Sequence, residues 1–179
     1  REVQSLARRV SLVQIARVAA ERCAVRKPVP MCRAMDDDVW VEADPERLTM
    51  VIEHVIRNAQ DASSESGTVR VGVTVDGGAG DDEVVPIGDT SRLRVPMATL
   101  TVTDRGAGMT REFVQERLFK PFDTTKGSKG MGIGAYQVRE YVLSLGGRVD
   151  VASEEGQGTR FTLRLPLAEA EGTVPVRDS

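Results

Sequence analysis

The 179-residue sequence has few aromatic residues, one histidine, two cysteines and no long apolar run. Aromatic residues make up only 4% of the chain and the net charge is -3. We therefore expect no nucleic-acid partner, because such a partner needs a basic surface and stacking rings. Two cysteines and one histidine exclude a disulfide framework and a Cys/His metal cluster, and they predict free thiols in a reducing compartment. No run of about 18 apolar residues is present that would span a bilayer.

The residues that are present have the balance of a globular protein, with 40% hydrophobic and 28% charged residues. A chain of this length forms one ordinary domain, which we place at 10–168, followed by a disordered tail at 169–179. Because the sequence begins at Arg1 rather than Met, we expect a fragment whose parent carries any membrane segment upstream.

The periodicity of apolar residues predicts the order of helices and strands. The predicted helices are 2–25, 45–63, 111–118 and 132–145. The predicted strands are one or two within 31–41, then 69–75, 93–103 (starting at Leu93 or Met97), 148–152 and 159–165. Residues 76–92 are predicted to be a mobile hairpin loop or an insertion. Asp44 and Pro45 are the N-cap and first residue of the second helix. Since the last two strands form a hairpin, we predict an α/β (α+β) fold, a two-layer sandwich with helices on one face of a mixed sheet.

Two glycine-rich segments favour a ligand with a flat ring and anionic groups. Asp104 ends a predicted strand and precedes Gly106 and Gly108, so its carboxylate can accept a hydrogen bond from an exocyclic amine while the glycines allow close backbone approach. Taken alone, this motif is equally well an ordinary turn. The second segment, 127–134, opens a helix, whose exposed amides form an anion site. It is neither a P-loop nor a Rossmann motif.

The second helix carries three polar residues on one face. His54, Asn58 and Asp61 follow the spacing i, i+4, i+7. The carboxamide oxygen of Asn58 suits Mg2+, and His54 is able to orient or deprotonate an attacking group. Alternatively, His54 is a histidine at a packed interface with no chemical role.

These motifs occur together and in order, and the combination resembles the GHKL superfamily of ATPases (HATPase_c), which includes gyrase B, Hsp90, MutL and the sensor histidine kinases. The resemblance implies a Bergerat-type fold that binds ATP and Mg2+, with Asn58 as the Mg2+ ligand and Asp104 at the adenine amino group. The ATP-binding residues that it implies are Asn58, Asp61, Asp104, Gly106, Gly108, Met109, Lys126, Gly130, Met131, Gly132, Ile133, Gly134 and Thr159.

Three further segments resemble the histidine kinase branch, namely 43–48, the F box at 118–122 with Lys126 after it, and 155–167. More narrowly, 124–127, 130–136 and 139–141 resemble the PEP-CTERM/exosortase-associated sensor kinases of PrsK type.

This branch implies transfer of the γ-phosphoryl group of ATP to a histidine on a dimerisation domain outside the sequence, with Lys126 and His54 as catalytic residues. It also implies that 1–9 end the upstream phosphoacceptor helix, and that a response regulator is a partner. We expect a homodimeric parent anchored in the inner membrane, with this fragment a cytoplasmic monomer.

Two other functions stay open. One is an ATP hydrolase of the gyrase, Hsp90 or MutL kind, which is disfavoured because its hydrolytic Glu is replaced by His54, and Glu53 points roughly 100° away on the helix. The other is a pseudokinase module that senses nucleotide, which the intact Asn58, Asp104 and glycines disfavour.

Overall fold

The computed structural model describes residues 6–36, 38–76, 96–120 and 134–168. Most of the expected loop at 76–92 (77–92), most of the glycine run (127–133) and the tail at 169–179 therefore lie outside the described residues.

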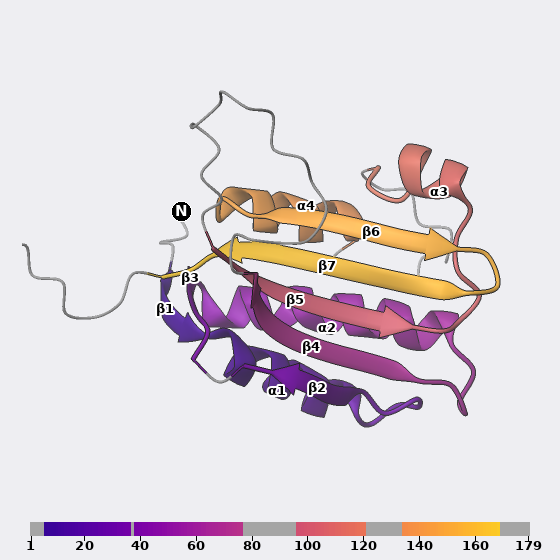
Figure 1. The fold of residues 1–179 in the computed structure, drawn as a ribbon, viewed down its shortest axis with the longest axis horizontal. Coiled ribbons are helices and arrows are strands. Elements are labelled where there is room, and N and C mark those ends of the chain that lie inside the picture. The colour runs from indigo at the N-terminus through magenta and orange to yellow at the C-terminus, as the bar shows by residue number, and fades with distance from the viewer. Residues whose placement is uncertain (1–5, 37, 77–95, 121–133, 169–179) are drawn as a thin grey trace, which may run out of the picture.

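A five-stranded sheet forms one layer of the molecule (Figure 1). Its strands, in spatial order, are β2 (Met31–Met35), β4 (Val69–Asp76), β5 (Met97–Asp104), β7 (Gly158–Pro166) and β6 (Arg148–Glu154). The β2–β4 pair is parallel and the other pairs are antiparallel, so the sheet is mixed as predicted.

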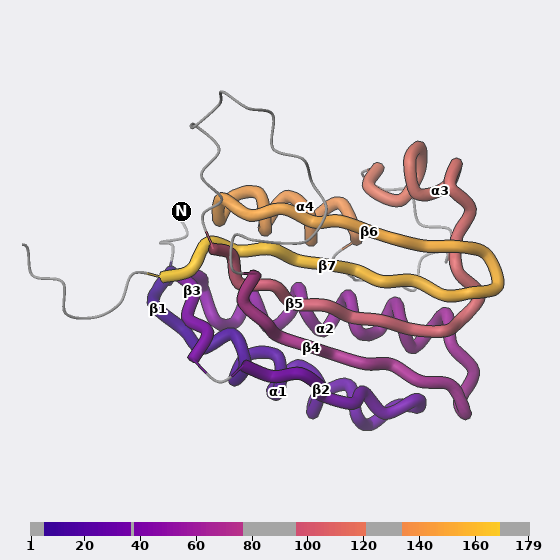
Figure 2. Tube along the Cα trace, viewed as in Figure 1, coloured from indigo at the N-terminus to yellow at the C-terminus, as the bar shows by residue number. Residues whose placement is uncertain are grey.

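Three helices form the second layer, on one face of the sheet (Figures 1 and 2). They are α1 (Leu12–Cys23), α2 (Pro45–Ala62) and α4 (Ala135–Ser144), while the short α3 (Arg111–Glu116) lies near the end of β6. The core between the layers consists of alternate strand residues and the apolar stripe of α2. Its fully buried members include Leu48, Ile52, Ile56, Val71, Leu100 and Leu163. The predicted two-layer fold is confirmed.

The predicted first helix begins too early, which is a correction. Arg8–Ser11 form strand β1, which pairs antiparallel with β3 (Trp40–Ala43), and α1 begins only at Leu12. Ser11 ends the strand and caps the helix, because its hydroxyl accepts a hydrogen bond from the Gln14 amide at 3.2 Å. Residues 8 and 9 are therefore not helical, and 1–5 lie outside the described residues.

The start of α2 is fixed as the sequence predicts. Asp44 accepts hydrogen bonds from the amides of Glu46 (3.0 Å) and Arg47 (3.4 Å), and Pro45 is the first helical residue. The Tyr141 hydroxyl of α4 accepts a hydrogen bond from the Asp44 amide at 3.2 Å. These contacts hold the N-terminal end of α2 against α4, and its other end reaches the carboxyl end of β5 (Figure 1).

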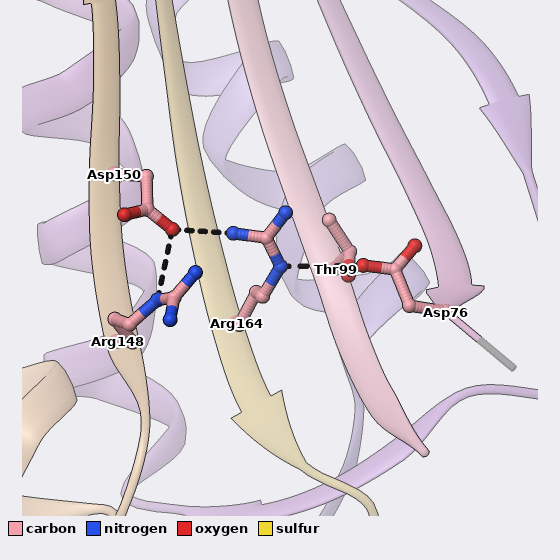
Figure 3. A network of polar contacts seen from close by, with 5 residues as sticks. All are labelled: Asp76, Thr99, Arg148, Asp150 and Arg164. Atoms are coloured by element: carbon pink, nitrogen blue, oxygen red, sulfur yellow. Dashed lines mark hydrogen bonds and ion pairs between the residues drawn. The ribbon is translucent and has the colours of Figure 1, made fainter. Parts of the chain in front are cut away.

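The open face of the sheet carries a chain of charged and polar side chains across four strands (Figure 3). Arg164 on β7 lies between Asp150 on β6, with which it forms an ion pair, and Asp76 on β4, at 3.2 Å from its Nε. Asp150 also accepts from Arg148 at 3.0 Å, and Asp76 accepts from the Thr99 hydroxyl at 2.9 Å.

Candidate nucleotide-binding site

Asp104 is a buried carboxylate at the carboxyl end of β5, with 5% of its surface exposed. Its Oδ1 accepts a hydrogen bond from the Gly106 amide at 2.8 Å, and the Thr159 amide is a second backbone donor. Burial raises the pKa of Asp104 above its ordinary value, and these two donors only partly offset this effect. Within the described part of the chain no cationic side chain pairs with this carboxylate, so it suits a neutral ligand that donates hydrogen bonds.

The glycines after Asp104 are required by close backbone approach. A Cβ on Gly106 would lie 2.1 Å from the carbonyl oxygen of Ala62, the last residue of α2. Gly108 has φ +70, and a Cβ there would lie 2.0 Å from the Glu154 carbonyl oxygen. The Ala107 amide donates to Ala62 at 3.0 Å. The loop therefore packs closely between the end of α2 and the β6–β7 turn. The glycine motif after Asp104 is thus not an unconstrained surface turn.

A hydroxyl pair lies across the β6–β7 hairpin beside this loop. Thr159 is directly opposite Ser153, and their hydroxyl oxygens are 2.8 Å apart. Ser153 also accepts a hydrogen bond from the Met109 amide at 2.8 Å. Thr159 and Met109 were predicted from sequence, whereas Ser153 was missed. The signal for Ser153 is the hairpin register, since the turn places it opposite Thr159.

A shallow cavity of about 350 Å³ opens at these strand ends. Its lining includes Asp104, Ser153 and Thr159, together with Thr103 and Arg160 from the open face. His54 and Asn58 are not part of this lining, so the cavity covers only the sheet side of the candidate site.

The structure brings His54 and Asn58 together on α2. The amide nitrogen Nδ2 of Asn58 lies 3.1 Å from Nε2 of His54, and both residues are half-buried. Asp61, which was predicted on the same face, forms an ion pair with Arg26, beyond the end of α1. Its contact with ATP stays a prediction.

Glu53 points away from the face that carries His54 and Asn58. It is buried, and its two carboxylate oxygens contact Arg22 of α1 at 3.2 Å and Arg57 of α2 at 3.5 Å. These ion pairs bind Glu53 to the α1–α2 interface. Glu53 therefore does not replace the hydrolytic Glu of gyrase-like ATPases.

Several predicted phosphate ligands cannot be placed. Lys126, Gly130, Met131, Gly132 and Ile133 lie outside the described residues. Gly134 is described, and it is the N-cap of α4, with its carbonyl oxygen accepting from the Gln137 amide at 2.9 Å. Among the described residues the helix begins at Ala135, and the predicted start at 132 lies outside the described residues.

The donor set for a cation is small. Among the described residues, no group of three or more His, Cys, Asp or Glu side chains forms a metal cluster. A single carboxamide oxygen on Asn58 fits Mg2+, because this ion is usually held by one or two protein oxygens together with substrate phosphates and water.

The fold and the sequence together place the chain in a known family of proteins. Residues 43–169 match the family described as histidine kinase-, DNA gyrase B-, and HSP90-like ATPase, and the chain belongs to that family. Within it, the chain is a catalytic ATP-binding domain of the histidine kinase type.

Individual relatives support this assignment. The chain is 35% identical over 127 residues to the sensor histidine kinase ZraS of Escherichia coli O157:H7, a match that covers 71% of this chain and 23% of ZraS. It thus spans about a quarter of that relative. The solved structure of the mycobacterial sensor histidine kinase MprB has a TM-score of 0.65 at 22% identity, covering 92% of this chain and 100% of that one. Full-length ShkA in complex with AMPPNP has a TM-score of 0.68 at 22% identity, covering 95% of this chain and 33% of ShkA.

Proposed function

We propose that this domain binds Mg-ATP and, within a longer sensor kinase, donates its γ-phosphoryl group to a histidine of a dimerisation domain. The main support for this proposal is the arrangement of Asp104. It is buried, has no cationic partner among the residues that the structure describes, and is joined through its loop to the end of the helix that bears Asn58. The similarity to ShkA, whose structure contains AMPPNP, supports it.

The sheet side of the site would select the base. The Asp104 carboxylate accepts a hydrogen bond from the adenine amino group, and the loop of Gly106 and Gly108 lies against the ring. The Ser153–Thr159 hydroxyl pair, at 2.8 Å, supplies a further polar contact beside the ring. Guanine carries a carbonyl oxygen where adenine has its amino group, so the carboxylate would repel it.

The helix side would hold the phosphates. Asn58 supplies a carboxamide oxygen to Mg2+, which neutralises phosphate charge when bound. Lys126 and the amides of 130–134 are proposed to contact the terminal phosphates, as the family resemblance implies. Phosphoryl transfer then depends on positioning and charge rather than on a covalent enzyme intermediate. A role of His54 in polarising the incoming histidine stays a hypothesis.

The whole-protein context belongs to the same proposal. We propose a homodimeric parent anchored in the inner membrane, with this domain on the cytoplasmic side as a monomer when isolated, and with a response regulator as the acceptor of the phosphoryl group. Residues 1–9 are proposed to end the upstream phosphoacceptor helix, except that Arg8 and Arg9 lie in β1. Among the described residues, no helix is long and apolar enough to span a bilayer. The narrower resemblance to PrsK-type kinases stays a prediction.

The test combines the chain with a fragment of the parent that carries the phosphoacceptor helix, using ATP labelled at the γ-phosphate. Label on a histidine of that fragment supports the kinase function. Free phosphate would instead indicate a hydrolase, and nucleotide binding with neither product would indicate a sensing module. The Asp104→Asn variant is the control for nucleotide-dependent labelling.

A further inference from the structure

The contact between His54 and Asn58 constrains both side chains. The Asn58 nitrogen Nδ2, at 3.1 Å from Nε2 of His54, is only able to donate. Nε2 must therefore accept, which places the ring proton on Nδ1. Nitrogen and oxygen occupy opposite ends of a carboxamide, so this hydrogen bond turns Oδ1 of Asn58 away from the ring.

We propose that His54 is a positioning residue that fixes the carboxamide of Asn58 with its oxygen available to Mg2+. The inference rests on the proposed Mg-ATP site. A carboxamide rotated by half a turn would present N–H donors to the cation, and these repel it. In the tautomer with its proton on Nδ1, His54 favours the productive orientation, because its accepting Nε2 pairs with the amide nitrogen of Asn58 and not with the oxygen.

The backbone beneath the two residues is already rigid. Val55, Ile56 and Ala59 bury the opposite side of α2 in the core, at 1%, 0% and 5% exposure. The Glu53 ion pair with Arg22 holds the neighbouring face against α1, and the ion pair with Arg57 lies within α2. The hydrogen bond between His54 and Asn58, at spacing i, i+4, restricts the side-chain torsions of both residues.

This role competes with that of a base acting on the incoming histidine. In the tautomer that accepts from Asn58, Nε2 has no second lone pair for another proton. Base chemistry at that nitrogen would break the contact with Asn58. Loss of a base would lower the phosphorylation rate without changing Mg2+-dependent binding, whereas loss of a positioning residue changes that binding.

The first experiment compares two variants of the 179-residue chain. His54→Gln keeps an accepting oxygen near the position of Nε2, and His54→Leu has a similar size but no acceptor. Calorimetry measures AMPPNP affinity with Mg2+ and with EDTA. We expect His54→Leu to lose roughly 10-fold of the Mg2+-dependent affinity, as is typical when a hydrogen-bond partner of a metal ligand is removed, with EDTA affinity unchanged. His54→Gln should stay within about threefold of the parent.

An equal loss of affinity for His54→Leu with and without Mg2+ indicates a packing role and overturns the proposal, as does parental Mg2+ dependence in that variant. Circular dichroism melting of each variant checks that it is folded, and a loss of affinity together with a loss of fold counts as the packing outcome.

The second experiment uses Asn58→Asp, whose two oxygens are equivalent and need no orientation. If His54 only orients Asn58, His54→Leu causes no further loss of Mg2+-dependent affinity in the Asn58→Asp background. Additive losses would overturn the proposal. Failure of the Mg-ATP site itself gives a different result: Asn58→Leu would then bind AMPPNP with the parental Mg2+ dependence, or the parent would show none.

Discussion

Asp104 at the end of β5 and Asp150 on β6 are carboxylates of the same sheet in opposite surroundings. Asp104 is 5% exposed and accepts from backbone amides, whereas the Asp150 side chain is 45% exposed and pairs with Arg148 and Arg164 (Figure 3). The pairing of Asp150 stabilises the fold slightly, as is usual for surface ion pairs. The burial of Asp104 costs folding free energy, so stability does not explain its presence, which is consistent with the nucleotide site proposed above.

The largest loss of folding stability should come from a substitution in the glycine loop that follows Asp104. Gly108→Ala combines a positive φ of +70 with a Cβ 2.0 Å from the Glu154 carbonyl oxygen. We expect a loss of about 4 kcal/mol in the free energy of unfolding, from about 1–2 kcal/mol of backbone strain and about 1–3 kcal/mol of overpacking. Urea denaturation measures it.

Gly156→Ala is the matched control for that variant. Gly156 also has a positive φ, +78, but a Cβ there meets nothing within 4 Å. Only the backbone strain of about 1 kcal/mol should appear. If the two variants lose equal stability, the close packing of the loop against the β6–β7 turn is refuted.

The next largest effect should be a loss of ATP affinity. Asp104→Asn replaces a charged acceptor by a neutral one, and we expect ATP affinity to fall by about 2 kcal/mol, or roughly 30-fold. GTP affinity should fall less or rise, because the new amide is able to donate to the guanine carbonyl oxygen. Fluorescence titration with both nucleotides measures the ratio. An unchanged preference for ATP would show that Asp104 does not read the base.

The parent and the Asp104→Asn variant should also differ in how their folding stability depends on pH. Burial raises the pKa of Asp104 above its ordinary value of 3.8, so the folded state binds the proton more tightly than the unfolded state. The stability of the parent relative to Asp104→Asn should therefore increase as pH falls from above the raised pKa to below 3.8, and stay constant above this window. Urea melts of both proteins across this range test it. An increase with rising pH would contradict the assigned burial of the charge.

A smaller loss of ATP affinity is expected when the hydroxyl pair of Ser153 and Thr159 is broken. Thr159→Val removes the 2.8 Å contact with Ser153 while keeping the side-chain shape. We expect a loss of about 1 kcal/mol in ATP affinity, or roughly fivefold. Thr162→Val, on the same strand but facing the open side, is the control and should leave ATP affinity unchanged. Equal effects of the two variants would remove Thr159 from the site.

The parts of the site that depend on short-range sequence patterns could be predicted from the sequence. The Asp44–Pro45 helix start, the Asp104 loop and the β6–β7 hairpin depend on residues close in the chain, and the structure confirms them. Ser153 was missed because the predicted strand ended at 152, whereas β6 extends to Glu154 and pairs Ser153 with Thr159. Strand β1 was mistaken for helix because its partner β3 lies about 30 residues later. Local patterns do not carry such pairings.

The smallest loss of folding stability is expected for a substitution in the ion pairs on the open face of the sheet. Asp150→Asn removes one acceptor from the chain of side chains in Figure 3, but Arg164 keeps its contact with Asp76 at 3.2 Å. We expect a loss of about 0.5 kcal/mol in the free energy of unfolding, which should shrink further at 1 M salt because exposed charges are screened. ATP affinity should not change. If Asp150→Asn lowered ATP affinity as much as Asp104→Asn, the open face would belong to the site, and burial would no longer distinguish the two carboxylates.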